Sequence, residues 1–374
     1  MEYQPWHLKY RPQLLKELTG HSLVTRTLSN AIKERKISNA YLFEGKSGTG
    51  KTSTARIFAK SLNCRESAKP TLMPCGKCLN CRSIEAVSSL DVLEVDAASK
   101  NKVEDIREII DLAQLFPVNS RYKVFIIDEA QMLTRHAQNA FLKTLEEATP
   151  QIVFVLATTE KEKLLRTIIG RCLHLEFSQL TRPDIVSRLK QICSKEKVKA
   201  SEDALALIAQ SCRGGMRDAI QLLEKLSISQ REIAVEDVKE ATGAIPTEKL
   251  LLILNSLFGG ETTGIHRLLR ISSELISQGK EPKKILAEIL EIYRDLLQLC
   301  LIADSSPTVE SEEIVLTSSI SLEHLQKIVQ MTSWRQLELG LEALEKAERE
   351  IELSPSPVAW LDIFFIRLAK LGMF

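Results

Sequence analysis

The chain has 374 residues, and its 50 Lys and Arg residues almost balance its 49 Asp and Glu residues, giving a formal net charge of +1. An apolar content of 44% and a charged content of 26% are ordinary for a globular protein and exclude disordered, collagen-like and rod-shaped coiled-coil chains. The length predicts about two or three domains. No apolar, uncharged window of about 18 residues occurs and no signal-peptide pattern opens the chain, so we expect a cytoplasmic protein without a membrane span.

The charge is unevenly distributed along the chain. Residues 1–180 have a positive balance, and residues 181–374 have a negative one. Any contact with a polyanion such as DNA is therefore expected to be local and in the first half. Chance variation in surface composition explains the difference equally well.

Short apolar runs alternate with helical patterns over the first 180 residues. Residues 52–63 and 136–147 have helical patterns. The apolar runs are four to six residues long and rich in β-branched and aromatic side chains, as in buried strands: 40–43, 92–95, 124–127 and 152–157. This alternation predicts a parallel sheet with helices on both faces.

After residue 179 the sequence predicts helices alone. The first helices expected are short, at 182–195, 202–212, 216–226 and 235–241. The segment that follows, 248–374, is also predicted to be helical, with breaks near 304–313 and at Pro355-Ser356-Pro357. We place domain boundaries near residues 180 and 243.

A phosphate-binding loop follows the first predicted strand. Residues 45–52 match G-x-x-x-x-G-K-[ST] and open a predicted helix, so backbone N–H groups and the helix N-terminus are expected to hold phosphates. Lys51 is expected to reach the β- and γ-phosphates, and the Thr52 hydroxyl to bind Mg²⁺. The nucleotide-binding residues predicted here are Gly45, Ser47, Gly48, Thr49, Gly50, Lys51, Thr52 and Ser53.

An acidic pair ends the strand over 124–127. Asp128 is expected to hold Mg²⁺, and Glu129 to polarise the attacking water as a general base. Alone, such a pair is more often a solvated strand end, but its position after a P-loop favours the catalytic interpretation. Thr158-Thr159 ends the next strand, where the hydroxyls either hold water near the γ-phosphate or cap the strand.

Four cysteines lie between the P-loop and the acidic pair. Cys64, Cys75, Cys78 and Cys81 have a spacing that suits tetrahedral Zn²⁺, and four protein ligands would leave no open position for catalysis. An iron–sulfur cluster is the alternative, although Glu85 occupies the position expected for a further cysteine. The other four cysteines are predicted to be small core residues: Cys172, Cys193, Cys212 and Cys300.

With these motifs in this order, the chain resembles the gamma/tau subunits of bacterial DNA polymerase III, the ATPase subunits of its clamp loader. The resemblance covers essentially the whole chain. Its most specific part is the four-cysteine insertion. Further matching segments are Lys9-Tyr10-Arg11-Pro12, Asp96-Ala97-Ala98-Ser99-Lys100, Phe141-Leu142-Lys143-Thr144-Leu145-Glu146-Glu147 and Leu156-Ala157-Thr158-Thr159.

The resemblance implies three domains. Residues 1–180 would form an α/β P-loop NTPase domain of the AAA+ class with a zinc-binding insertion at about 64–81. Residues 181–243 would form an all-α lid, and residues 244–374 an all-α collar that holds a pentameric ring together. The implied cofactors are ATP, Mg²⁺ and Zn²⁺. The implied partners are other clamp loader subunits, the sliding clamp, primer-template DNA and, indirectly, the polymerase core.

The resemblance also implies roles for further residues. Thr159 would be sensor 1, and Arg217 would be sensor 2, reaching the phosphates of its own subunit. Arg171 would be an arginine finger that completes a neighbour's site. The dipeptide Arg11-Pro12 would lie beside the adenine.

Two implications of the resemblance are less specific. The family usually has Ser where this chain has Gly170, which predicts a looser position for Arg171. Lys100 and Lys102 would follow the template phosphates inside the ring, or else belong to an ordinary solvated helix face.

Three functions are consistent with these motifs. The leading hypothesis is an ATP-driven clamp loader subunit with no polymerase site of its own. A DNA-translocating motor of the branch-migration helicase type is the second, but the cysteine insertion and the absence of a terminal winged-helix pattern argue against it. The third is a ring subunit that binds ATP without hydrolysing it, which the intact Lys51, Asp128 and Glu129 argue against.

Overall fold

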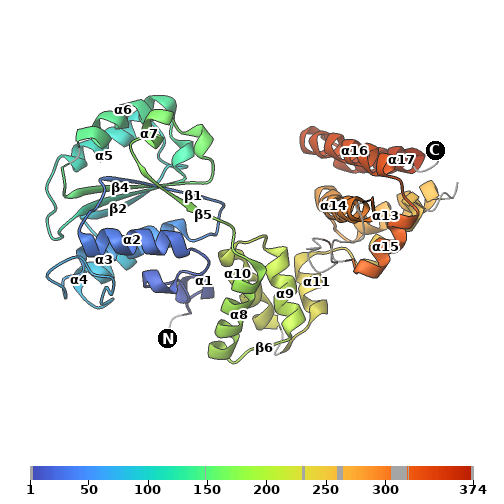
Figure 1. Cartoon of the computed structure of the whole chain (residues 1–374), viewed down its shortest axis with the longest axis horizontal. Coiled ribbons are helices and arrows are strands. Elements are labelled where there is room, and N and C mark those ends of the chain that lie inside the picture. Colours follow the sequence, from blue (N-terminus) through green and yellow to red (C-terminus); the bar gives the residue numbers. More distant parts are fainter. Residues whose placement is uncertain are drawn as a thin grey trace. The chain divides into compact units, whose positions relative to one another are not determined.

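The computed structural model describes residues 3–147, 149–229, 232–258, 264–304, 318 and 320–371. The chain forms two compact units, residues 1–238 and residues 239–374 (Figure 1). Residues 181–238, which make up most of the predicted lid at 181–243, belong to the first unit, and residues 239–243 belong to the second. The boundaries near 180 and 243 therefore stay predictions.

A parallel five-stranded sheet forms the centre of the first unit, in the order β2-β3-β4-β1-β5. Asp128 at the end of β3 pairs with Asp96, and Thr158 at the end of β4 pairs with Glu44 of β1, so the strand ends meet at one edge. The strands are β1 (Ala40–Gly45), β2 (Val92–Asp96), β3 (Lys123–Asp128), β4 (Ile152–Thr158) and β5 (Leu173–Phe177). This edge is where ligands bind in open parallel sheets.

Helices cover both faces of the sheet (Figure 1). Tyr41 and Phe43 of β1 point to the face covered by α2 (Ser22–Glu34), α3 (Lys51–Asn63) and α4 (Leu79–Glu85). Ala40 and Leu42 point to the face covered by α5 (Val103–Ala113), α6 (Arg135–Glu147) and α7 (Arg166–Ile169). Because β1, β3 and β4 are buried on both faces, they appear in the sequence as continuous apolar runs, and the predicted α/β layering is confirmed.

The fifth strand was not among the predicted strands. β5 lies at the edge of the sheet, with Leu175 and Phe177 buried and His174 and Glu176 exposed. An edge strand that is half exposed does not show a continuous apolar run.

The rest of the first unit is mainly helical, with α8 (Arg182–Glu196), α9 (Glu202–Ser211) and α10 (Met216–Ser229), and α11 (Val235–Thr242) follows. Thr181 and Ser201 cap α8 and α9 by accepting hydrogen bonds from Asp184 N and Ala204 N. The expectation of helices alone was wrong in one detail, since β6 (Lys199–Ala200) and β7 (Glu232–Ile233) pair in parallel. Two-residue strands are too short to show any periodicity.

The described part of the first unit also contains the short 3₁₀ helices η1 (Leu15–Glu17), η2 (Ala130–Met132) and η3 (Lys161–Lys163) and the one-turn helix α1 (Trp6–Lys9).

The second unit is helical in its described residues. Its helices are α12 (Thr247–Phe258), α13 (Gly264–Ser277), α14 (Pro282–Asp304), α15 (Leu322–Gln330), α16 (Trp334–Leu353) and α17 (Pro357–Leu371). They share one apolar core that includes Tyr293, Phe364 and Phe365. Gly340 of α16 lets Tyr293 of α14 approach, because a Cβ there would lie 2.4 Å from the Tyr293 ring.

The two predicted breaks in this unit differ in outcome. The break at Pro355-Ser356-Pro357 is confirmed, because α16 ends at Leu353 and α17 begins at Pro357. The break near 304–313 lies, apart from Asp304, outside the described residues. No helix in the described part of the chain is both long and apolar enough to span a membrane.

Candidate nucleotide-binding and catalytic site

The P-loop links β1 to α3 through backbone conformations that need glycine. Gly50 has φ 103° immediately before α3, a conformation that L side chains rarely adopt. Gly45 lies so close to β5 that a Cβ would be 2.3 Å from the Phe177 carbonyl oxygen. The loop can therefore turn sharply from the sheet edge into the N-terminus of a helix, where N–H groups bind anions.

Lys51 lies inside the curve of the loop. Its Nζ donates to the carbonyl oxygens of Gly45 (2.6 Å) and Lys46 (3.0 Å), and the residue is only 6% exposed. Burial lowers the pKa of Lys51, while the nearby carboxylates of Glu129 and Asp128 oppose this shift. The ammonium group thus lies against the loop that is predicted to bind phosphates.

Thr52 and Asp128 meet at the sheet edge, as the sequence predicted. The Thr52 hydroxyl donates to Asp128 Oδ2 over 2.7 Å, joining the start of α3 to the end of β3. A hydroxyl and a carboxylate provide the oxygen ligands that Mg²⁺ prefers, and this pair borders the loop that would hold phosphates. The donor set therefore fits a magnesium ion.

Glu129 follows directly and turns the chain away from the sheet. Its φ of 50° is in the left-handed region, and its backbone N–H donates to Asp128 Oδ1 over 3.1 Å. Asp128 and Glu129 both line the pocket that the P-loop borders, together with Lys51 and Thr52. The structure thus brings the predicted magnesium ligand and the predicted general base to the same pocket.

Gln131 is a residue of this site that the sequence analysis missed. Its Nε2 donates to Glu129 Oε2 (2.6 Å) and to Thr159 Oγ1 (2.8 Å). Its Oε1 accepts from Thr158 Oγ1 (2.8 Å) and, more weakly, from Thr159 N (3.4 Å). Thr159 does not line the pocket itself, but one amide connects it to Glu129. No motif marks a glutamine two residues after an acidic pair.

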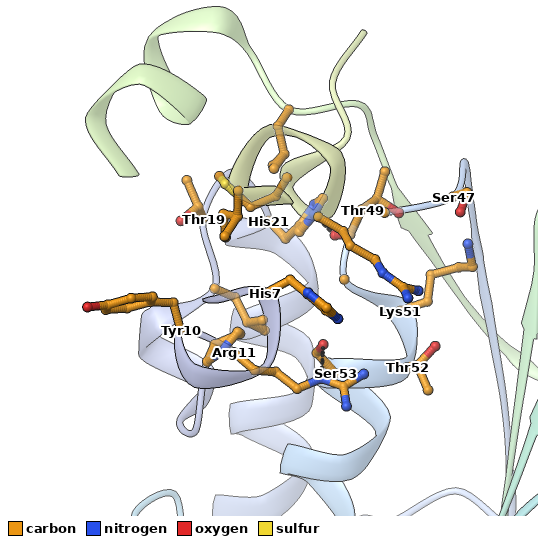
Figure 2. A pocket seen from close by; sticks show the side chains of 18 of the residues that line it. His7, Tyr10, Arg11, Thr19, His21, Ser47, Thr49, Lys51, Thr52 and Ser53 are labelled. Carbon is orange, nitrogen blue, oxygen red and sulfur yellow. Dashed lines mark hydrogen bonds between the residues drawn. The ribbon is translucent and has the colours of Figure 1, made fainter. Parts of the chain in front are cut away.

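The N-terminal segment forms one side of the same pocket. Arg11 and Pro12 line it, as the resemblance implied, and Arg11 Nε donates to Ser53 Oγ over 2.8 Å. Figure 2 shows His7 and Arg11 beside the P-loop residues Lys51 and Thr52. Burial, together with nearby charges that include Arg56, lowers the pKa of Arg11.

His7 is a second pocket residue that the sequence analysis missed. Its Nδ1 is buried without a hydrogen-bond partner among the described residues. Burial, and then the positive charge of Arg217, lower its pKa, so the ring is neutral near pH 7. The side chain faces the pocket only because α1 packs there, which no local pattern indicates.

Helices α8 and α10 form the side of the pocket opposite the N-terminal segment. Arg217 and Met216 of α10 line the pocket, as does Arg188 of α8. α1 holds these helices, because Glu224 of α10 accepts from the Trp6 N–H (3.0 Å) and Glu196 of α8 accepts from the Lys9 ammonium (2.5 Å). Arg217 thus lies in the pocket that the resemblance assigned to it.

Arg171 lies apart from this pocket. Its Nε donates to Glu146 Oε1 (2.6 Å) and one Nη to the Thr167 carbonyl oxygen (2.7 Å), and its side chain is 36% exposed. Gly170 has φ −67° and ψ −13°, which serine also adopts, so the glycine gives the backbone no special conformation here. A surface position is compatible with a role toward a neighbouring subunit.

Lys100 and Lys102 are both exposed, just beyond the end of β2. Lys102 precedes α5, and its N–H donates to Asp105 Oδ2 over 3.0 Å. Their exposure fits both a phosphate contact and a solvated helix face, so both interpretations stay open.

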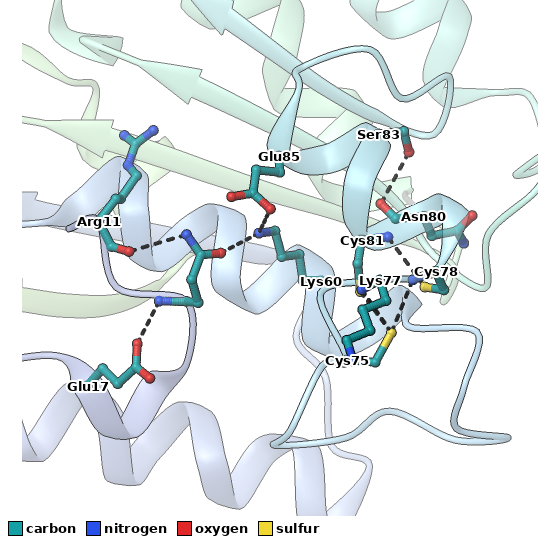
Figure 3. Close-up of polar contacts among 11 residues, drawn as sticks. Arg11, Glu17, Lys60, Cys75, Lys77, Cys78, Asn80, Cys81, Ser83 and Glu85 are labelled. Carbon is teal, nitrogen blue, oxygen red and sulfur yellow. Dashed lines mark hydrogen bonds and ion pairs between the residues drawn. The ribbon is translucent and has the colours of Figure 1, made fainter. Parts of the chain in front are cut away.

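The four cysteines converge into one cluster. The sulfur atoms of Cys64, Cys75, Cys78 and Cys81 all lie within 4.8 Å of one another. Figure 3 shows three of these residues, Cys75, Cys78 and Cys81, close together. Backbone N–H groups point at the sulfurs, from Cys75 to Cys64 Sγ (3.4 Å) and from Cys78 to Cys75 Sγ (3.2 Å). Four converging sulfurs with amide donors around them fit a tetrahedral ion held by thiolates.

The remaining cysteines fit the core prediction to different degrees. Cys193 and Cys300 are buried, whereas Cys172 and Cys212 are half-buried. Burial raises the pKa of Cys172 to about 12. Thiols in such surroundings stay protonated and unreactive.

A buried lysine connects the cysteine module to the pocket that the P-loop borders (Figure 3). Lys60 of α3 is 4% exposed, and its Nζ donates to Gln13 Oε1 (2.7 Å) and Glu85 Oε2 (3.2 Å). Gln13 in turn donates to the Arg11 carbonyl oxygen over 3.2 Å. Glu85 ends α4, the helix that begins at the cysteines, so these hydrogen bonds link the module to Arg11, which lines the pocket.

Three family models match successive parts of the chain. Residues 20–181 match the model described as DNA polymerase III, delta subunit. Residues 184–226 match the ATPase lid domain of the DNA polymerase III clamp loader subunit. Residues 233–373 match domain III of the DNA polymerase III subunits gamma and tau.

Relatives along the whole chain are found among curated proteins. The chain is 36% identical to the DNA polymerase III subunit gamma of Buchnera aphidicola subsp. Schizaphis graminum, over 95% of each chain. It is also 36% identical to the subunit tau of Bacillus subtilis, over 99% of this chain but only 64% of that protein. Among solved structures, the Thermotoga maritima RuvB Holliday junction branch migration motor aligns with 74% of this chain and 86% of its own, with 21% identity and a TM-score of 0.47.

Proposed function

Because the chain belongs to the family of DNA polymerase III gamma and tau subunits, we propose that it is an ATPase subunit of a clamp loader. In this role ATP binding and hydrolysis drive the opening of a sliding clamp and its placement at primed DNA. The observation that carries the proposal is the meeting of Lys51, Thr52, Asp128 and Glu129 in one pocket with Arg217 from α10. The residues proposed to bind phosphates, to hold Mg²⁺ and to act as the base thus line the same pocket.

The proposed mechanism assigns a separate task to each group. The P-loop N–H groups and Lys51 hold the phosphates, and Thr52 and Asp128 hold Mg²⁺, which neutralises phosphate charge when bound. Glu129 accepts a proton from a water molecule as the water oxygen attacks the γ-phosphorus and the bond to the ADP oxygen breaks. Thr159 orients that water.

Two arginines would stabilise the charge that develops on the γ-phosphoryl group. Arg217 lines the pocket of its own chain, so it would act within the subunit. Arg171 lies at the surface and is paired with Glu146, so it would act in a neighbouring subunit after exchanging that carboxylate for phosphate oxygens. This arrangement requires a ring, which we propose to be pentameric and held by the collar at 244–374.

The four-cysteine cluster is proposed to bind Zn²⁺. With four thiolate ligands from the protein, the ion would have a structural role and would fix the 64–81 insertion on α3. An iron–sulfur cluster is the alternative that metal analysis would distinguish.

Primer-template DNA and the polymerase core complete the proposed partners. Lys100 and Lys102 are the candidate contacts to the template phosphates. Polymerisation is assigned to partner subunits, which the chain would reach indirectly through the loader.

The ATPase rate with and without clamp and primed DNA tests the proposal. We expect clamp and primed DNA to stimulate hydrolysis, and Glu129→Gln to bind ATP nearly normally while its turnover falls by about 10²-fold or more. Turnover that depends on translocation along unprimed DNA would indicate a motor instead. Binding without any turnover under all conditions would indicate a structural ring subunit.

A further inference from the structure

The side chain of Gln131 contacts both halves of the proposed hydrolytic machinery. It lies in η2, just after β3, and reaches Glu129 in the same segment and Thr158 and Thr159 at the end of the neighbouring strand β4. These are the proposed general base and the proposed sensor. Every polar atom of the amide group has a protein partner in this contact.

The chemistry of the partners fixes the orientation of this amide. A carboxylate only accepts hydrogen bonds, so the group 2.6 Å from Glu129 Oε2 must be the Gln131 NH₂. The amide oxygen then faces the Thr158 hydroxyl at 2.8 Å and the Thr159 N–H at 3.4 Å, both of which donate. A flipped amide would place two oxygen acceptors against each other, so the connection has one stable arrangement.

This orientation has consequences for both partners. The NH₂ group donates a hydrogen bond to Glu129 Oε2. This bond holds the flexible carboxylate in one rotamer and leaves Oε1 for a water molecule. The NH₂ group also donates to Thr159 Oγ1 over 2.8 Å, so the hydroxyl hydrogen of Thr159 points away from Gln131. Base and sensor are therefore oriented by the same group.

We propose that Gln131 is a positioning residue that couples the sensor Thr159 to the general base Glu129. The proposal rests on the ATPase function proposed above. Movement of the end of β4 would be transmitted through the amide to the Glu129 carboxylate, so that the base is aligned only when the sensor is in place. A purely structural role, supporting the turn at η2, is the competing explanation.

The kinetic test replaces Gln131 with leucine, which keeps the approximate size and removes all of its hydrogen bonds. We expect kcat to fall by about 10- to 100-fold, the scale of a misaligned reacting group, while the ATP dissociation constant changes less than about threefold. Gln138→Leu is the control, because Gln138 bonds only backbone groups, including the Leu133 carbonyl oxygen (3.0 Å), and is more deeply buried than the half-buried Gln131. That control should lose stability without a selective loss of kcat.

A double mutant separates coupling from support of the turn. If Gln131 acts through Glu129, adding Gln131→Leu to Glu129→Gln should lower kcat little further, because the base it aligns is already gone. Independent, multiplicative losses would overturn the proposal. An equal loss of kcat and ATP affinity in Gln131→Leu would also overturn it.

A selective fall in kcat with little change in ATP affinity is the readout that a purely structural role would not produce. If the parent chain shows no ATPase activity at all, the proposed function fails; if it does and these variants match it, the inference alone fails.

Discussion

Glu288 provides a sharp test of how burial sets charge in the second unit. This glutamate lies in α14, and its two carboxyl oxygens accept from the Ile245 N–H at 3.1 and 3.3 Å. Burial, the largest influence, raises its pKa from 4.5 to about 7, with Glu291 adding to the shift while the Ile245 hydrogen bond and Lys280 oppose it. Replacement by glutamine keeps a carbonyl acceptor for Ile245 and removes the ionisation.

The sign and size of the effect follow from the pKa shift. Between pH 4.5 and about 7 the folded unit holds a proton that the unfolded chain has lost, so stability falls as pH rises through this window. Each pKa unit corresponds to about 1.4 kcal/mol, and partial exposure of the side chain reduces the total, so we expect a loss of about 1–3 kcal/mol. Glu288→Gln should match the parent near pH 5 and exceed its stability by that amount near pH 8.

Tryptophan fluorescence during urea unfolding of the full chain measures this difference. The chain has three tryptophans, and a Trp6→Phe background leaves Trp334 and Trp360, both in the second unit. Glu342→Gln, at an exposed position of α16, is the matched control and should leave the pH dependence unchanged. If the parent is equally stable at pH 5 and 8, or if Glu288→Gln keeps the same pH slope, the reasoning from burial is refuted.

Three further predictions concern the proposed function. Arg171→Ala should bind ATP and assemble, but its rate of ATP hydrolysis should fall by about 10³-fold. Rings that mix Arg171→Ala with Lys51→Ala subunits should regain activity in an ATPase assay. No recovery at any mixing ratio would exclude action of Arg171 across a subunit interface. Elemental analysis should find one Zn²⁺ per chain, and chelation should lower the unfolding midpoint of the first unit, whereas iron or metal-free protein would contradict the zinc assignment. Lys100→Ala with Lys102→Ala should weaken DNA stimulation and flatten the salt dependence of DNA affinity while the basal rate is unchanged; an unaltered salt slope would favour the solvated helix face.

The sequence by itself was enough for the features that depend on short stretches of chain. The P-loop needs glycines and a lysine at fixed spacing because the phosphate group that it wraps is small. In the structure Gly50 has a positive φ ahead of α3, and the Lys51 ammonium lies against the loop. The buried strands β1, β3 and β4 were predicted because burial on both faces demands a continuous apolar run.

The tertiary structure alone decided which distant residues share a site. Gln131 joins Glu129 to Thr159 only because β3 and β4 are neighbours in the sheet, and His7 faces the pocket only because α1 packs beside the P-loop. The edge strand β5 was found only in the tertiary structure, because its exposed side chains interrupt the continuous apolar run that marks a buried strand. A hydrogen bond between residues far apart in sequence leaves no periodic signal, because it depends on where folding brings two backbones and not on the spacing of side chains along either one.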